Sequence, residues 1–286
     1  MNFVRCNFCG NEEHNEFLFS KKSSLRSDET MYNIFKCAKC KVSFADQEQI
    51  DKIDLQKIYD EYFSDEKHKK KLENPNANRK YWLKQSKTIN KLYPKGGRIL
   101  DIGCNAGHFL YFLKGNWEKH GVELSQYAAN IAKNKNLEIF NGYLEDAKYS
   151  SDYFDVITLY AVIEHVEYPS ELLDEIKRVL KHNGLCVIMT GDKDSIKAKS
   201  KKENWHMYSP PLHLYFFSHE SLDNFMREKM FEKIKSIYTD GGMTSCRNKY
   251  INYGIRLLLT AMEKIPYLNE IPIFDHMYSY YKLFKR

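Results

Sequence analysis

The chain has 286 residues and a net charge of +6, from 44 lysines and arginines against 38 acidic residues. Its 43% hydrophobic and 29% charged residues are ordinary for a globular protein and exclude a wholly disordered or fibrous chain. Neither a secretory signal nor an apolar run of 18 residues is present, so we expect a soluble cytoplasmic protein, without a transmembrane segment, whose seven cysteines stay reduced. At this length, one core domain with a small appendage is expected.

Residues 1–45 contain two cysteine pairs of the form Cys-x-x-Cys. The two-residue gap lets both thiolates of a pair reach one metal ion, and four thiolates suit tetrahedral Zn²⁺. A site with four protein ligands has no open position for catalysis, so the zinc would be structural. The sequence therefore predicts a small zinc-ribbon module over residues 1–45, with four ligands: Cys6, Cys9, Cys37 and Cys40.

Residues 46–95 alternate helical patterns with charge runs around the helix breaker Asn74-Pro75-Asn76. This pattern predicts a helical lid or linker segment. Three tyrosines of the segment are candidates for contact with a ligand, although tyrosines at helical spacing more often pack: Tyr59, Tyr62 and Tyr81.

From residue 96 to residue 240 the sequence repeats strand, turn and helix in order, which predicts a parallel sheet flanked by helices. Strands are expected at residues 98–102, 117–123, 137–140, 154–160, 184–190 and 231–238. Helices are expected at residues 106–113, 125–133, 170–181 and 218–227, with Ser125 and Ser218 as N-terminal caps. Residues 241–286 are predicted to form a helical tail, and packing against the protein is favoured over a helix on a membrane surface.

The most informative segment is Asp101-Ile-Gly-Cys-Asn-Ala-Gly107, where the first strand of this region gives way to a helix. Glycines at such a turn let the backbone approach a ligand closely, and the helix terminus offers unpaired N–H groups. The spacing does not fit the G-x-G-x-x-G fingerprint of dinucleotide sites, and the Gly-Lys-Ser/Thr of a Walker loop is missing. The loop therefore predicts a site for a nucleoside that carries no phosphate.

The run Ile99-Leu-Asp-Ile-Gly-Cys104, followed by Gly107-His-Phe-Leu110, resembles motif I of the class I S-adenosylmethionine-dependent methyltransferases. The resemblance covers roughly residues 81–238 and implies an α/β, Rossmann-like doubly wound fold with a mostly parallel seven-stranded sheet. It departs at Asn105, where most members have glycine. Because asparagine tolerates a left-handed φ better than other non-glycine residues, we expect the turn to survive.

Later landmarks of the family follow in the expected order. Gly121-Val-Glu-Leu-Ser125 closes the second strand, and the resemblance assigns the ribose hydroxyls to Glu123. Gly142-Tyr-Leu-Glu-Asp146 is similar to the segment that lines the adenine, and Val162-Ile-Glu-His-Val166 matches the pattern after the fourth strand. Together the motifs imply an S-adenosylmethionine site formed by Asp101, Gly103, Asn105, Gly107, Glu123, Leu124, Leu144, Glu145 and Tyr160.

Two histidines are candidates for the base that removes a proton from the acceptor, His165 and His213. His165 follows Glu164 after the fourth strand, and His213 lies in the aromatic stretch from Trp205 to Ser218, which covers the substrate in similar enzymes. Either histidine could instead have a structural role, one in the wall of the site and the other in the loop. In ubiquinone-pathway O-methyltransferases an acid three residues before Glu164 helps to hold a metal. Here that residue is Ala161, which argues against metal-assisted catalysis.

A zinc ribbon in front of this core also resembles the sugar-modifying methyltransferases of deoxysugar and glycan pathways. Their longer C-methylating members carry a further C-terminal domain, which this sequence is too short to include. We therefore expect O-methylation of a small molecule: a sugar, a nucleotide-sugar or a surface-glycan precursor.

Two alternatives stay open. The first is an RNA or protein methyltransferase docked by the ribbon, although the basic clusters at 67–71 and 197–202 are typical of solvated surface and nucleic acid is the less favoured partner. The Asn/Asp-Pro-Pro-Tyr/Phe motif of base N-methylation is also missing after the fourth strand. The second is an inactive scaffold that binds S-adenosylmethionine. The sequence does not predict the oligomeric state.

Overall fold

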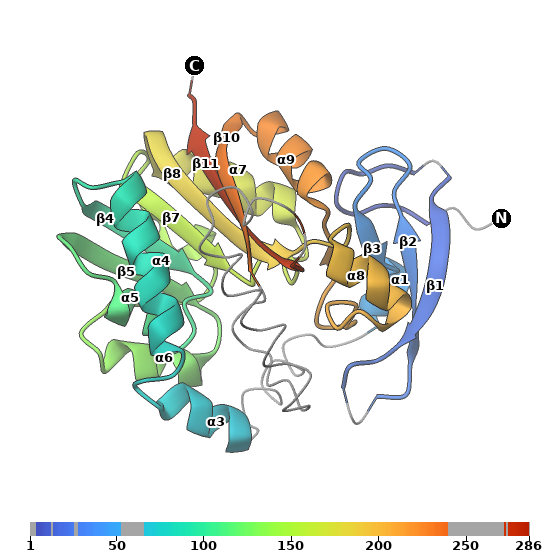
Figure 1. Cartoon of the computed structure of the whole chain (residues 1–286), viewed down its shortest axis with the longest axis horizontal. Helices are drawn as coiled ribbons and strands as arrows, with labels where there is room; N and C mark the ends of the chain where they lie inside the picture. Colours follow the sequence, from blue (N-terminus) through green and yellow to red (C-terminus); the bar gives the residue numbers. More distant parts are fainter. Residues whose placement is uncertain are drawn as a thin grey trace.

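The computed structural model of the chain describes residues 4–12, 14–25, 28–52, 66–239, 272 and 274–285. These residues form two sheets, a large one that carries most of the core and a small one near the N-terminus (Figure 1). Tyr59, Tyr62 and most of the predicted tail lie outside the described residues. None of the described helices has the length and apolar character needed to cross a membrane.

The large sheet has seven strands in the order β10-β11-β8-β7-β4-β5-β6. Their bounds are β4 (Gly97–Ile102), β5 (Trp117–Glu123), β6 (Glu138–Asn141), β7 (Phe154–Tyr160), β8 (Leu180–Gly191), β10 (Phe231–Thr239) and β11 (His276–Leu283). The five neighbouring strands β8, β7, β4, β5 and β6 run parallel to one another, and β11 is antiparallel to both of its neighbours. The predicted Rossmann-like, mostly parallel, seven-stranded sheet is therefore confirmed.

The prediction of a helical tail over residues 241–286 is wrong at its end, because residues 276–283 form strand β11. The segment is rich in tyrosine, which favours strands. It lies between β8 and β10 and is buried on both faces, so its sequence lacks the alternation of apolar and polar residues that marks a half-exposed strand. Residues 241–271 of the predicted tail are outside the described part of the chain.

The two faces of the large sheet have separate hydrophobic cores, because side chains alternate along each strand. One face packs against α4 (Arg79–Leu92) and α5 (His108–Phe112), through residues such as Ile99, Val156, Val187 and Tyr278. The other packs against α7 (Pro169–Val179) and α9 (His219–Glu228), through residues such as Leu100, Ile157, Ile188 and Met277. Helices on both faces make the fold doubly wound (Figure 1).

Local signals in the sequence set the helix starts. Ser125 and Ser218 cap α6 (Gln126–Lys133) and α9, as predicted, each accepting a hydrogen bond from the backbone N–H three residues on. The predicted helical segment contains α1 (Gln47–Ile50), α3 (Glu66–Glu73) and α4, with the breaker at residues 74–76 separating the last two. Short helical turns complete the fold: η1 (Glu145–Ala147), α8 (Ile196–Lys201) and η2 (Lys202–Asn204).

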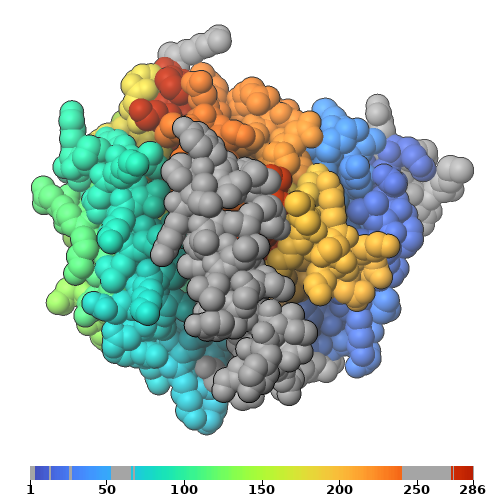
Figure 2. Space-filling model, in the orientation of Figure 1, coloured from blue at the N-terminus to red at the C-terminus, as the bar shows by residue number. Residues whose placement is uncertain are grey.

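The small sheet consists of β1 (Glu16–Lys22), β2 (Met31–Lys36), β3 (Ser43–Ala45) and β9 (Tyr215–Phe216), in that order and all antiparallel. Its fourth strand belongs to the segment between β8 and α9, so the predicted module boundary at residue 45 cuts through a continuous sheet. Phe8 packs against Tyr215, Phe217 and Phe225. The backbone N–H of Ser24 also donates to the carbonyl of Pro210, at 2.8 Å. The N-terminal module therefore lies directly against residues 196–225, as Figure 2 shows in blue beside yellow and orange.

Candidate active site

The order of the strands reverses between β4 and β7, and ligands of open α/β sheets bind where the order reverses, at the carboxyl ends of the strands. The predicted nucleotide loop leaves β4 at this point. Gly103 has φ of +64°, and a Cβ added there would lie 2.6 Å from a methyl group of Val162, just after β7. A larger residue at position 103 would push apart the two loops that frame the site.

Asn105 adopts φ of 51°, so the expected left-handed turn is present with asparagine in place of glycine. Its backbone N–H donates to Oε2 of Glu123 at 2.8 Å, and the N–H of Ser125 donates to Oε1 at the same distance. Burial raises the pKa of Glu123. The carboxylate is thus fixed by two backbone donors, and each oxygen keeps a further lone pair for a ligand hydroxyl.

Asp101 lies at the end of β4 and is buried. Its Oδ1 accepts a hydrogen bond from Thr158 of β7 at 2.6 Å. Burial, together with the negative charge of Glu123, raises the pKa of Asp101 to about 8. This carboxyl group is therefore largely protonated at neutral pH and can donate a hydrogen bond as well as accept one.

A cavity of about 1430 Å³ opens at this edge of the sheet. Small-molecule sites commonly measure roughly 300–1,000 Å³, so this cavity has room for two molecules side by side. All but one of the residues predicted to bind the cofactor or to act as base line it: Asp101, Gly103, Asn105, Glu123, Leu124, Leu144, Glu145, Tyr160, His165 and His213. The exception is Gly107, which caps α5 at φ of 70°. A Cβ there would meet Leu137 at 2.6 Å, so Gly107 supports the turn from behind.

The two predicted histidines are neighbours, with ring centroids 4.6 Å apart and rings nearly perpendicular. Nδ1 of His165 contacts the carbonyl oxygen of Leu212 at 2.7 Å, and Nδ1 of His213 contacts that of Met207 at 2.7 Å. A carbonyl only accepts, so both Nδ1 atoms carry the proton when the rings are neutral. Burial lowers the pKa of His213 to about 3. His213 is thus neutral at physiological pH and a weak proton acceptor.

Glu164 precedes His165 and is buried. Among the residues that the structure describes, neither of its carboxylate oxygens has a hydrogen-bond partner, and burial raises its pKa. Its ligand atoms and those of His165 and His213 lie within 4.8 Å of one another, a spacing that a divalent cation could accept. Ala161 supplies no side-chain ligand where the metal-binding O-methyltransferases have an acid.

Several residues that line the cavity were missed by the sequence analysis. Trp82 on α4 lines it, whereas the predicted Tyr81 packs behind, with its hydroxyl against that of Tyr278. His276 was missed because its strand was taken for helix. Had the aromatic segment been identified as a strand, a histidine at its first position would have pointed to the same edge of the sheet.

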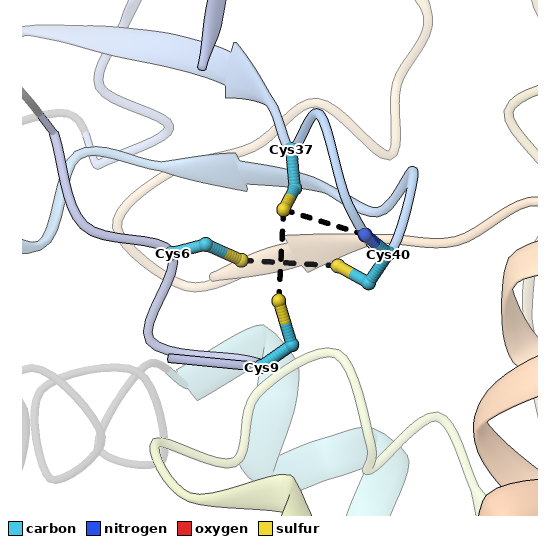
Figure 3. Close-up of side chains that lie close together, drawn as sticks. All are labelled: Cys6, Cys9, Cys37 and Cys40. Atoms are coloured by element: carbon cyan, nitrogen blue, oxygen red, sulfur yellow. Dashed lines mark hydrogen bonds between the residues drawn. The ribbon is translucent and has the colours of Figure 1, made fainter. Parts of the chain in front are cut away.

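The four predicted zinc ligands come together in the N-terminal module (Figure 3). Sγ of Cys6 lies 3.9 Å from Sγ of Cys40, and Sγ of Cys9 lies 3.6 Å from Sγ of Cys37. Four thiolates bound tetrahedrally to zinc at about 2.3 Å would have their sulfurs about 3.8 Å apart. The described cysteines form no disulfide, so the thiols are available, and their arrangement fits a zinc ion.

A known family matches this chain. The profile of the methyltransferase-domain family matches residues 76–236, more than half of the sequence. An uncharacterized protein of Methanocaldococcus jannaschii is 30% identical over 154 residues, which are 53% of this chain and 72% of that protein. The mitochondrial ubiquinone biosynthesis O-methyltransferase of Schizosaccharomyces pombe is 33% identical over 109 residues, which are 33% of this chain and 38% of the yeast enzyme.

Solved structures share the fold. A methyltransferase of Thermotoga maritima, described as a possible histamine N-methyltransferase, superposes with a TM-score of 0.51 and 23% identity, over 72% of this chain and 89% of its own. The [4+2]-cyclase SpnF superposes with a TM-score of 0.50 and 17% identity, over 71% of this chain and 81% of its own. At these identities the likeness concerns the fold alone, and the reactions named for the two proteins differ.

Proposed function

Because the chain belongs to the family of S-adenosylmethionine-dependent methyltransferases, we propose that it methylates a hydroxyl oxygen of a small, carbohydrate-derived molecule. When bound, S-adenosylmethionine supplies a methyl group made electrophilic by its sulfonium. The observation that carries the proposal is the large cavity, with the nucleotide loop on one side and a cluster of acidic and imidazole groups on the other. One side suits the donor and the other suits a hydroxyl acceptor.

The donor half is formed by the loop after β4 and the ends of β5 and β6. Glu123, already held by two backbone N–H groups, would accept hydrogen bonds from the ribose hydroxyls. Leu144 and Glu145, which follow β6, would lie along the adenine. Gly103 and Asn105 keep the backbone close enough for the methionine part of the donor to pass between β4 and β7.

The acceptor half favours a molecule rich in hydroxyl groups. Four carboxylates on or near α7 line the cavity: Glu167, Glu171, Asp174 and Glu175. Asp174 pairs with Lys229 and Glu175 pairs with Arg178, so Glu167 and Glu171 are the two that can accept hydrogen bonds from hydroxyls. The exposed rings of Tyr143 and Tyr168 offer flat surfaces against which the C–H face of a sugar can pack. The yeast O-methyltransferase further supports oxygen as the acceptor atom.

We also propose that the N-terminal cysteines bind a structural Zn²⁺. The sulfur separations and the reduced thiols support this ion, and the four ligands leave it no catalytic position. His165 and His213 remain candidates for contact with the acceptor. With its pKa near 3, His213 would contribute a lone pair that orients the hydroxyl rather than a site for the proton.

The test combines binding and turnover. Calorimetry with S-adenosylhomocysteine should show binding by the wild type and strongly reduced binding by Glu123→Ala. Transfer of labelled methyl groups into fractionated small metabolites, RNA and protein from the source cell should label a hydroxylated, carbohydrate-containing small-molecule fraction. Label in RNA or protein would overturn the choice of acceptor. Binding without any transfer would indicate a scaffold, and no binding would overturn the proposal as a whole.

A further inference from the structure

Asp275 is a buried carboxylate that contacts four side chains, two of which, His206 and His276, line the cavity. Its Oδ1 accepts hydrogen bonds from Nζ of Lys197 at 3.0 Å and from Nδ1 of His276 at 3.2 Å. Its Oδ2 accepts one from Nε1 of Trp205 at 2.8 Å and pairs with Nδ1 of His206 at 3.5 Å. The side chain is fully buried, and its partners hold its pKa below the ordinary value despite that burial. Asp275 is therefore an ionised carboxylate with every lone-pair direction in use.

His276 is the one partner of Asp275 that also begins a strand of the large sheet. It pairs with Gly191, the last residue of β8. Because β11 runs antiparallel to β8, its first residue lies at the carboxyl edge of the sheet, the edge where ligands bind. The imidazole lines the cavity and is 14% exposed. With its Nδ1 proton donated to Asp275, the lone pair of His276 is on Nε2.

This arrangement distinguishes His276 from the two histidines that the sequence predicted. In His165 and His213, Nδ1 contacts a neutral backbone carbonyl, whereas in His276 it contacts a carboxylate. A positive charge that forms on an imidazole is stabilised by a carboxylate more than by a carbonyl. Of these three rings, His276 is the one whose Nδ1 contacts a carboxylate.

The charges around His276 are of both signs. Asp275, the residue before β11, contacts His276 directly, and Lys197 of α8 contacts the same carboxylate. The ring of His206 lies 5.6 Å away, at 32° to that of His276. His276 also acts electrostatically on Glu164 and His213, which line the same cavity. The base is thus near the acidic group of the acceptor site, and its carboxylate partner is shielded from solvent.

We propose that His276 is the general base of the methyl transfer and that Asp275 is its positioning residue. The inference rests on the proposed function. In the step, the acceptor oxygen bonds to the methyl carbon while the bond from that carbon to sulfur breaks, with the electron pair staying on sulfur. The hydroxyl proton passes to Nε2 of His276. The products are the methyl ether, S-adenosylhomocysteine and a protonated His276 that returns its proton to solvent.

The test compares variants with [14C-methyl]-labelled S-adenosylmethionine and the metabolite fraction that the wild type labels. Glutamine keeps a donor for Asp275 but is a poor base, so His276→Gln should lower kcat by about 10²-fold or more and remove the fall in rate at acidic pH. Asp275→Asn should lower kcat by about tenfold and leave KM for the donor unchanged. His182→Gln is the matched control, because His182 is an exposed residue at the other end of β8.

Two readouts separate a base from a structural residue. His276→Ala should regain activity when imidazole is added, and both His276 variants should bind S-adenosylhomocysteine within about twofold of the wild type. Transfer by His276→Gln within threefold of the wild type, or a loss that imidazole does not relieve in a variant that still binds, would overturn the assignment alone. No transfer by the wild type itself would overturn the proposed function and this inference with it.

Discussion

The donor half and the acceptor half of the cavity are built in different ways. In the donor half, Glu123 is held by backbone groups of residues close to it in sequence, Asn105 and Ser125, and the longer-range contact is that of Asp101 with Thr158. In the acceptor half the contacts join distant segments: the N–H of Leu214 donates to the carbonyl of Glu164, and Trp205 donates to Asp275. The donor half is thus mainly a local motif, whereas the acceptor half depends on how the N-terminal module, the segment between β8 and α9, and β11 pack together.

The largest effect should follow loss of the zinc ligands. Cys37→Ser should abolish the zinc content measured by mass spectrometry and lower Tm by more than about 10 °C, since structural zinc contributes on the order of 10 kcal/mol in small zinc domains. Because β3 pairs with β9, methyl transfer should be lost while affinity for S-adenosylhomocysteine stays within about threefold. The control variant Cys186→Ala, which changes a buried cysteine of the large sheet, should keep the zinc content of the wild type. Equal loss of both functions would contradict the division into two halves.

Glu123→Ala should produce the reverse pattern. The variant loses hydrogen bonds between a charged group and the ribose, each contributing about 1.5–3 kcal/mol, so affinity for S-adenosylhomocysteine should fall by about 10²-fold or more. Zinc content should not change. Glu118→Ala, a more exposed glutamate on the same strand, should bind within twofold of the wild type in calorimetry. A similar loss in both variants would show that Glu123 has no special contact with the donor.

Because the pKa of Asp101 is raised in the folded chain, the free energy of unfolding should fall as the pH rises. Its folded-state pKa of about 8 exceeds the ordinary 3.8, so the folded chain binds more protons than the unfolded chain between these values. Its contribution to stability is complete below about pH 4 and is lost as the pH rises through 8. Relative to Asp101→Asn, the wild-type free energy of unfolding should decline from pH 5 to pH 8 by at most about 1.4 kcal/mol per pH unit. A constant difference in denaturant titrations would contradict the raised pKa.

Asn105→Gly should have the smallest effect. Glycine adopts φ of 51° without strain, but the variant loses the hydrogen bond from the N–H of Ala106 to Oδ1 of Asn105. These two effects oppose each other, so affinity for S-adenosylhomocysteine should change by less than about threefold. Asn105→Val, a branched residue at positive φ, should bind at least tenfold more weakly. Equal binding by the two variants would exclude the backbone turn as the reason for asparagine here.

The difference between local and long-range contacts also explains which elements of the fold could be predicted from the sequence. Six strands of the large sheet and the helices that connect them follow local signals: short apolar runs, caps such as Ser125 and Ser218, and the breaker at residues 74–76. Strand β11 was missed because a strand buried on both faces has no period-two pattern. Strand β9 was missed because its two residues have no strand signal of their own and pair with β3 across a distance of about 170 residues in the chain.

For the site, the residues predicted to bind the donor belong to motifs with fixed spacing, and all but Gly107 line the cavity; their contact with the donor stays a prediction. The sequence also identified His165 and His213, but the tautomers of both rings depend on carbonyl partners that no motif encodes. It missed the pair of Asp275 and His276, whose importance depends on the position of β11 in the sheet. When tertiary contacts alone bring two residues of a site together, the sequence contains no fixed spacing that would identify them.

The pairing of β9 with β3 has a consequence for recombination between related enzymes. The N-terminal module cannot be exchanged by itself, because a module from another enzyme would have to pair with β9 and to pack against the same aromatic rings as Phe8. A chimera that keeps function should therefore carry the module and the segment from residue 205 to residue 218 from the same parent. Such a chimera would also keep His213, which belongs to that segment, together with the module.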